Sequence, residues 1–81
     1  MAELANHALY YRMSCPYCVK VVRFMDSRGI TMEMKDTTIP GNVEELIKIG
    51  GKRQVPCLVI DGKALYESDD IIAYLDKEVP A

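Results

Sequence analysis

The order of apolar patterns in the first 35 residues constrains the fold most strongly. Residues 7–11 form a short apolar run of the length expected for a buried strand. Apolar residues then recur at the spacing of one helical face, at Cys18, Val21, Val22 and Met25. We expect this helix to begin at Pro16 and to end before Gly29. Residues 30–35 alternate between apolar and polar, which predicts a strand that buries Ile30, Met32 and Met34. A strand–helix–strand order predicts parallel strands joined by a right-handed crossover.

A second helix is expected after the turn at residues 40–41. Asn42 is placed to cap this helix, and Glu45 stands three residues later at the position of a capping box. The glycines at residues 50–51 are expected to end it. Its inward-facing side chains are expected to be Val43, Leu46 and Ile47.

The last third of the chain predicts a hairpin followed by a helix. Residues 57–60 and 64–66 are expected to pair as strands around the Asp-Gly turn in residues 61–63. Ser68 is expected to cap a last helix that ends before Pro80 and turns Ile71, Ile72 and Leu75 inward. The whole order, β-α-β-α-β-β-α, predicts an α/β protein with a mixed four-stranded sheet flanked by helices.

Size and charge exclude several classes of function. Eighty-one residues leave room for one domain, which we expect to span residues 1–81. A formal net charge of −2 provides no broad positive field for a phosphate backbone, so we expect no nucleic-acid partner. No apolar run approaches the roughly 20 residues that span a bilayer, and we expect a cytoplasmic protein with no membrane partner.

The segment Cys15-Pro16-Tyr17-Cys18 carries the chemistry, because it lies where the first strand meets the first helix. Pro16 suits the first helical position and leaves Cys15 at the cap, where unpaired N–H groups and the helix dipole stabilise an anion. We therefore expect Cys15 to be a thiolate nucleophile, with Arg12 adding positive charge. Cys18 belongs to the apolar face, so we expect it to be the less exposed, resolving thiol.

Zinc binding is the alternative interpretation of two cysteines at this spacing. A structural zinc ion needs about four ligands, and the chain offers only Cys57 and His7 in addition. The strand-to-helix position also favours redox chemistry over metal binding, and we expect no metal site. Cys57 follows Pro56 in an apolar strand and is expected to be a buried hydrophobic thiol and not a third catalyst. If it is partly exposed, the alternative is that it is glutathionylated or oxidised.

From Ala8 to Leu75 the sequence resembles the glutaredoxins of the thioredoxin superfamily. The resemblance rests on the tetrapeptide at residues 15–18, on Gln54-Val55-Pro56 before the third strand, and on Ser68-Asp69-Asp70 at the start of the last helix. It implies the thioredoxin fold and glutathione-dependent reduction of protein disulfides and of protein–glutathione mixed disulfides. Glutathione would be a co-substrate, and we expect no tightly bound cofactor.

The resemblance also implies where glutathione would lie. Pro56 would be a cis proline facing the cysteines, and the backbone of Val55 would pair with the cysteinyl part of the ligand. Ser68 and Asp69 would receive the γ-glutamyl end, although Ser-Asp-Asp is also a good helix cap in any protein. Tyr17 would line the groove or else face solvent. The glycyl carboxylate would meet basic and polar residues drawn from Arg12, Lys35, Arg53 and Gln54, each of which is otherwise a solvated surface residue.

Two segments depart from the usual glutaredoxin pattern. Gln54-Val55-Pro56 and Glu67-Ser68 look more like the N-terminal domain of glutathione transferases, and Glu67 would then share the γ-glutamyl role with Ser68. Both groups of proteins bind glutathione. A transferase would need a further helical domain, so we do not expect a complete transferase.

We therefore expect a monomeric dithiol oxidoreductase whose partners are glutathione and disulfide-containing or glutathionylated proteins. One alternative is an iron–sulfur carrier, in which two chains hold a cluster through Cys15 and two glutathiones. Another is thioredoxin-like reduction without glutathione, which conflicts with Tyr17 because thioredoxins typically have Gly-Pro between the cysteines.

Overall fold

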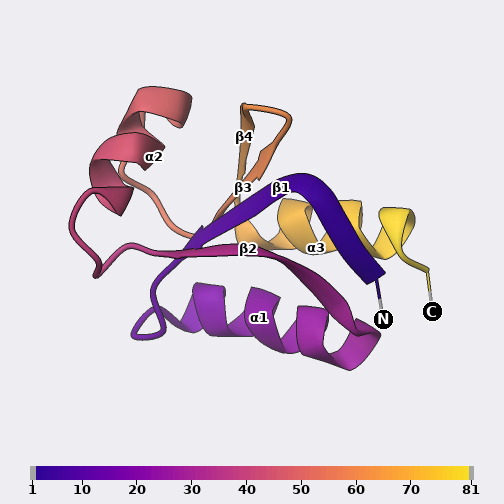
Figure 1. The fold of residues 1–81 in the computed structure, drawn as a ribbon. Coiled ribbons are helices and arrows are strands. Elements are labelled where there is room, and N and C mark those ends of the chain that lie inside the picture. Colours follow the sequence, from indigo (N-terminus) through magenta and orange to yellow (C-terminus); the bar gives the residue numbers. More distant parts are fainter. Residues whose placement is uncertain (1, 81) are drawn as a thin grey trace.

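The computed structural model describes residues 2–80, and its elements follow the expected order (Figure 1). The strands are β1 (Ala2–Tyr11), β2 (Ile30–Asp36), β3 (Cys57–Ile60) and β4 (Lys63–Tyr66). The helices are α1 (Pro16–Arg28), α2 (Asn42–Gly50) and α3 (Ser68–Glu78). The strands form one sheet in the order β2-β1-β3-β4, with β1 and β2 parallel and the other neighbours antiparallel. The predicted mixed four-stranded sheet is confirmed.

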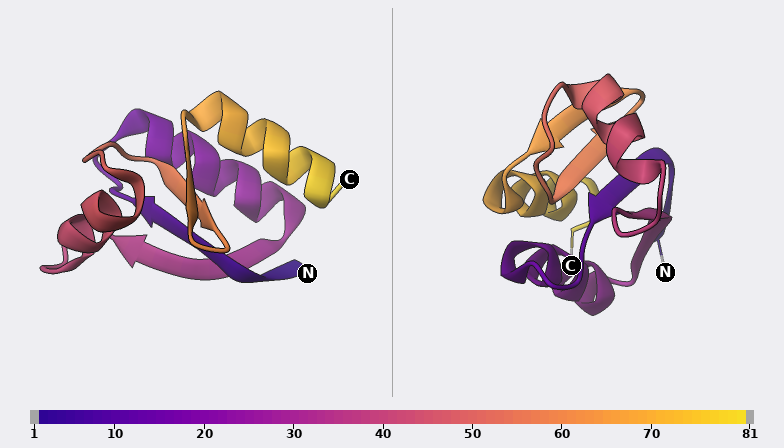
Figure 2. Two further views of the ribbon diagram at one scale, coloured as in Figure 1. Left: turned by 90° about the horizontal axis from the view of Figure 1, so that it is seen from above. Right: turned by 90° about the vertical axis from the view of Figure 1, so that its left-hand side faces the viewer.

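The two faces of the sheet are covered differently. Helices α1 and α3 lie side by side on one face, whereas α2 lies near one end of the molecule (Figure 2). Successive side chains of β1 point to opposite faces of the sheet. Leu9 therefore packs in the core under α1 and α3, and Tyr10 packs in the core under α2. The larger core comprises Leu9, Val21, Met25, Ile30, Leu58, Ile71 and Leu75. The smaller one comprises Tyr10, Leu46, Cys57 and Val59.

Helix α2 is tied to the sheet by a polar cluster. The buried Tyr10 hydroxyl donates a hydrogen bond to Glu45, and the Lys35 ammonium lies 3.3 Å from the same carboxylate. Both partners lower the pKa of Glu45, the Tyr10 hydrogen bond most strongly. Burial, together with this hydrogen bond, raises the pKa of Tyr10. This cluster replaces the predicted capping box, because Glu45 reaches across to the sheet instead of back to its own helix.

The start of α2 and its inner face also differ from the sequence prediction. Gly41, with φ of +97°, is the cap residue, and the Asn42 side chain instead donates to the Asp36 carbonyl at 2.8 Å. Leu46 is buried as expected, but Ile47 is 41% exposed. The helix meets the sheet along a narrow strip, and Ile47 lies outside it.

Strands β1 and β2 were predicted only in part. β1 begins at Ala2, five residues before the expected start, and its pairing with β2 shifts between Glu3 and Ala8. Asn6 has a φ of +63° in this irregular stretch, and its carbonyl accepts the Asp61 N–H at 2.9 Å. The irregularity breaks the local pattern on which strand prediction depends. Met34, expected in the core, is 39% exposed because β2 is one of the two edge strands.

The hairpin is confirmed, with Asp61 and Gly62 at positive φ in its turn. The cap of the last helix lies one residue earlier than predicted. Glu67, with φ of +74°, is the cap residue in place of Ser68, which is buried and is the first helical residue. Among residues 2–80, no helix is long and apolar enough to cross a membrane.

Candidate functional site

Three chain junctions meet at one end of the sheet. Cys57 of β3 pairs with Tyr10 of β1 on one side and with Tyr66 of β4 on the other. The chain leaves β1 for Cys15 just beyond this level, enters β3 through residues 54–56, and leaves β4 for α3. The antiparallel pairing therefore brings together the three segments that the sequence singled out, although they are about 40 and 50 residues apart along the chain.

Cys15 occupies the cap of α1, as predicted, and Pro16 opens the helix. Its backbone is extended, with φ of −96° and ψ of 119°, and its N–H donates to the Arg12 carbonyl at 3.0 Å. Its carbonyl accepts the first helical hydrogen bond from Val19 at 3.1 Å. No side chain caps the helix, so the first N–H groups are free to face the Cys15 sulfur, which is partly exposed.

The two thiols of the tetrapeptide ionise differently. Partial burial by itself raises the pKa of Cys15, but hydrogen bonds from the backbone and thiol of Cys18 and from the Tyr17 N–H outweigh it. The Arg12 charge acts in the same direction, and the pKa of Cys15 is lowered. Cys18 has no exposed surface, and burial raises its pKa to about 11. One thiol is prepared to attack and the other is kept protonated.

A groove of about 630 Å³ lies beside this dithiol. It is lined by Tyr17, Gln54, Val55, Pro56, Glu67, Ser68, Asp69 and Asp70. The Val55–Pro56 peptide bond is cis, as the resemblance implies. Sheet pairing of this segment begins only at Cys57, so the Val55 backbone lies outside the ladder. All expected contact residues except the basic ones, Arg12, Lys35 and Arg53, thus line one groove.

Two polar contacts involve side chains that line the groove. The Gln54 amide donates to the Glu67 carboxylate at 3.3 Å, and the Lys20 ammonium of α1 pairs with Asp69 of α3. Sequence reasoning did not find Lys20. Its position one helical turn after Tyr17 places both residues on one face of α1, which is the signal that was available.

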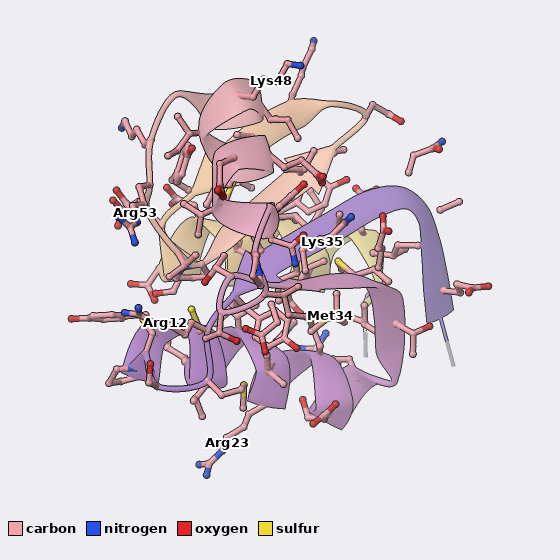
Figure 3. All side chains as sticks on the ribbon, turned by 60° about the vertical axis from the view of Figure 1, so that its left-hand side comes forward. Arg12, Arg23, Met34, Lys35, Lys48 and Arg53 are labelled. Carbon is pink, nitrogen blue, oxygen red and sulfur yellow. The ribbon has the colours of Figure 1, made fainter. Side chains whose placement is uncertain are left out.

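The basic residues expected around the glycyl carboxylate separate into two places. Arg12 and Arg53 line a smaller hollow of about 280 Å³ together with Val55, and Figure 3 shows both on the same side of the molecule. Lys35 stands apart from them (Figure 3), since it pairs with Glu33 of β2 and with Glu45 of α2. Of the two alternatives for Lys35, the structure agrees with a surface residue, because these tertiary partners hold it away from Arg12.

Cys57 is buried, as expected, and burial raises the pKa of its thiol. The hydroxyl of Tyr66 lies against this thiol and donates to the Lys52 carbonyl at 3.1 Å. A larger hollow of about 840 Å³ lies on the α2 side of the sheet, but none of its lining residues is a cysteine. Within residues 2–80, no group of three or more His, Cys, Asp or Glu side chains is arranged so that it could hold a metal ion.

Comparisons with known proteins identify the family of this chain. Residues 9–81 match the family model described as glutathione S-transferase, N-terminal domain. The chain is 33% identical over 73 residues to glutaredoxin 3 of Escherichia coli (strain K12), and the match covers 86% of each protein.

Solved structures of transferases have the same fold. Glutathione S-transferase 1-6 from Anopheles dirus species B matches 90% of this chain with a TM-score of 0.75 and 27% identity. Glutathione transferase Omega 3C from Trametes versicolor matches 95% with a TM-score of 0.81 and 25% identity. The chain spans 36% and 33% of these two transferases, respectively.

Proposed function

Because the chain belongs to the glutaredoxins of the thioredoxin superfamily and has the features of the glutathione S-transferase N-terminal domain, we propose that it is a dithiol oxidoreductase that uses glutathione. Its substrates are protein disulfides and protein–glutathione mixed disulfides. The redox role that depends on glutathione is supported by the glutaredoxin relatives. The roles of individual residues are our proposal.

The observation that carries the proposal is that the pKa values of two thiols one helical turn apart are shifted in opposite directions. Cys15 lies at the helix cap with a lowered pKa, whereas Cys18 is buried with a pKa of about 11. Only a thiolate attacks a disulfide, so Cys15 is the nucleophile at neutral pH. The protonated Cys18 must lose its proton before it can act, which makes it the slower resolving group.

The reaction proceeds by two thiol–disulfide exchanges. The Cys15 thiolate attacks the glutathionyl sulfur of a mixed disulfide, a new S–S bond forms, and the protein thiolate leaves and takes up a proton. A second glutathione thiolate then attacks the glutathionyl sulfur on Cys15, which yields oxidised glutathione and restores the Cys15 thiolate. For a protein disulfide, the Cys15 thiolate attacks one substrate sulfur, and Cys18 then loses its proton and attacks the sulfur of Cys15, which releases the reduced substrate and leaves a Cys15–Cys18 disulfide. One glutathione thiolate opens this disulfide at Cys15 and a second removes the glutathionyl group, which yields oxidised glutathione. The cycle therefore consumes one free glutathione for a mixed disulfide and two for a protein disulfide.

Glutathione lies in the groove in this proposal. The backbone of Val55 pairs with its cysteinyl part, Pro56 and Tyr17 form the walls, and Gln54 and Arg12 face the glycyl end. Ser68 and Glu67 stand at the γ-glutamyl end, where the α3 N-terminus attracts a carboxylate and Asp69 an ammonium. We further propose that this one domain is sufficient for the activity.

The decisive experiment compares Cys15→Ser with Cys18→Ser in turnover of a glutathionylated peptide by glutathione and its reductase. Cys15→Ser should abolish turnover because the nucleophile is gone. Cys18→Ser should retain much of it because glutathione itself releases the enzyme.

Mass spectrometry provides the control for this comparison. After exposure to oxidised glutathione, Cys18→Ser should carry one glutathione on Cys15, and Cys15→Ser should carry none. Equal losses of turnover in both variants, or an adduct on the buried Cys57, would contradict the assigned roles.

A further inference from the structure

An ion pair at the edge of the groove joins Asp69 to Lys20, a residue that has no role in the reaction proposed above. Lys20 projects from α1, one helical turn beyond Tyr17, and its ammonium contacts the carboxylate of Asp69 in the first turn of α3. Tyr17 and Asp69 both line the groove. The pair therefore joins the two helices at the end of the groove where the γ-glutamyl group is proposed to bind.

The fold has little need of this ion pair. Its side chains are 50% and 82% exposed, and pairs of such exposure contribute little to stability because water screens them. The contact between α1 and α3 is made by the larger core, through residues such as Val21 and Ile71. Lys20 and Asp69 can therefore separate and each bind a ligand group instead, with little loss of stability.

The charges around Asp69 show what Lys20 adds. Glu67, Asp69 and Asp70 all line the same end of the groove, so their negative charges oppose the attraction of the α3 N-terminus for a carboxylate on the ligand. Among the ion pairs of residues 2–80, only the pair between Lys20 and Asp69 involves one of these three acids. It is the positive charge placed to offset them.

An amino-acid head group is complementary to such a pair. It carries an ammonium and a carboxylate on one carbon, and Lys20 and Asp69 present the opposite charges in contact with each other. When the ammonium binds Asp69, the released Lys20 can bind the carboxylate, and no charge is left without a partner. A ligand that lacks either charge leaves one protein group unpaired.

We propose that Lys20 is a specificity-determining residue that binds the α-carboxylate of the ligand's γ-glutamyl group by exchanging its partner Asp69. This proposal rests on glutathione as the ligand of the groove. It predicts that the protein selects thiols with a complete amino-acid head group.

Three mixed disulfides of one reporter peptide test the proposal. The first contains glutathione, the second 4-aminobutyryl-cysteinyl-glycine, which lacks the α-carboxylate, and the third glutaryl-cysteinyl-glycine, which lacks the ammonium. Lys20→Met should lower kcat/KM about three- to fivefold for the first and third substrates, the size expected for one exposed charge pair, and leave the second unchanged. Lys20→Arg should restore the preference for the first over the second.

Lys77→Met is the matched control, because it removes the same charge from the last turn of α3. It should leave the ratios between all three substrates unchanged. If Lys20→Met lowers kcat/KM equally for all three substrates, the lysine acts only through long-range charge. If it changes none of them, the ion pair is purely structural. Either result overturns the proposal.

Binding measurements separate this proposal from the proposed function. Titration of the S-methyl derivatives of the three peptides, followed by NMR shifts of the α3 amides, requires no chemistry. If the protein turns over no mixed disulfide, the oxidoreductase proposal fails, whereas the role of Lys20 is still decided by whether Lys20→Met weakens binding of S-methylglutathione selectively.

Discussion

Three positions separate Cys15 from Cys18, yet their thiols lie in different surroundings. The cap position leaves Cys15 among unpaired N–H groups, whereas one further turn places Cys18 on the helical face that packs into the protein. Burial therefore dominates the pKa of Cys18, and hydrogen bonds outweigh it at Cys15. The geometry at the start of α1 therefore determines that Cys15 attacks first and Cys18 second.

The pH dependence of alkylation tests this difference. At pH 7 iodoacetamide should modify Cys15 faster than Cys18, as read by peptide mapping. Arg12→Gln removes a positive charge that lowers the pKa of Cys15, so the thiolate forms at higher pH and the alkylation profile of Cys15 should shift upward. Arg23→Gln, on the exposed side of α1, is the control and should leave the profile in place. Faster modification of Cys18, or identical profiles for both arginine variants, would refute this account.

At the scale of elements, the end of α2 depends on close contact with β4. Gly50 is the last residue of α2, and a Cβ atom there would overlap the Tyr66 hydroxyl and lie 3.0 Å from the Cβ of Ala64. Helix propensity alone favours alanine over glycine by about 1 kcal/mol. The contact with Tyr66 therefore opposes the local preference.

Gly50→Ala should accordingly destabilise the protein, by about 1–3 kcal/mol for an overpacked site, as measured by urea unfolding. Tyr66→Phe removes the hydroxyl that the new methyl group would meet. In the double variant the cost of Gly50→Ala should be smaller than in the wild type. A stabilised Gly50→Ala protein would mean that propensity outweighs the contact.

At the scale of the whole molecule, the site depends on the central strands. β1 and β3 lie between the two cores, and their paired ends hold the junctions that lead to Cys15 and Pro56. Leu58 is fully buried two residues after Pro56, in the core under α1 and α3. Packing in this core and placement of the groove are therefore coupled.

Leu58→Ala should cost about 2–5 kcal/mol, the range for a buried leucine that leaves a cavity. This is a large part of the 5–15 kcal/mol typical of a whole domain, so turnover should be lost at a lower temperature than in the wild type. Ile39→Ala, at a side chain that is 54% exposed, is the control and should change stability by no more than about 0.5 kcal/mol. Similar unfolding midpoints for the two variants would contradict this assignment of the core.

Local patterns were sufficient for the element order, the hairpin turn, the start of α1 and the burial of Cys18. Each depends on neighbours within one or two turns of chain, such as Pro16 after Cys15 or Gly62 after Asp61. The patterns were insufficient where a distant partner decides. Glu45 bonds to Tyr10 instead of its own helix, Met34 lies on an edge strand, and Ile47 lies outside the strip that meets the sheet.

The sequence by itself determined which residues can react and which elements carry them, because helix caps, turns and apolar periodicity act over a few residues. Only the tertiary structure decided which of those residues share a groove. It brought Asp69 against Lys20 and placed Lys35 with Glu45 away from Arg12. Such pairings depend on strand order and helix packing, which join residues from different elements and leave no local pattern.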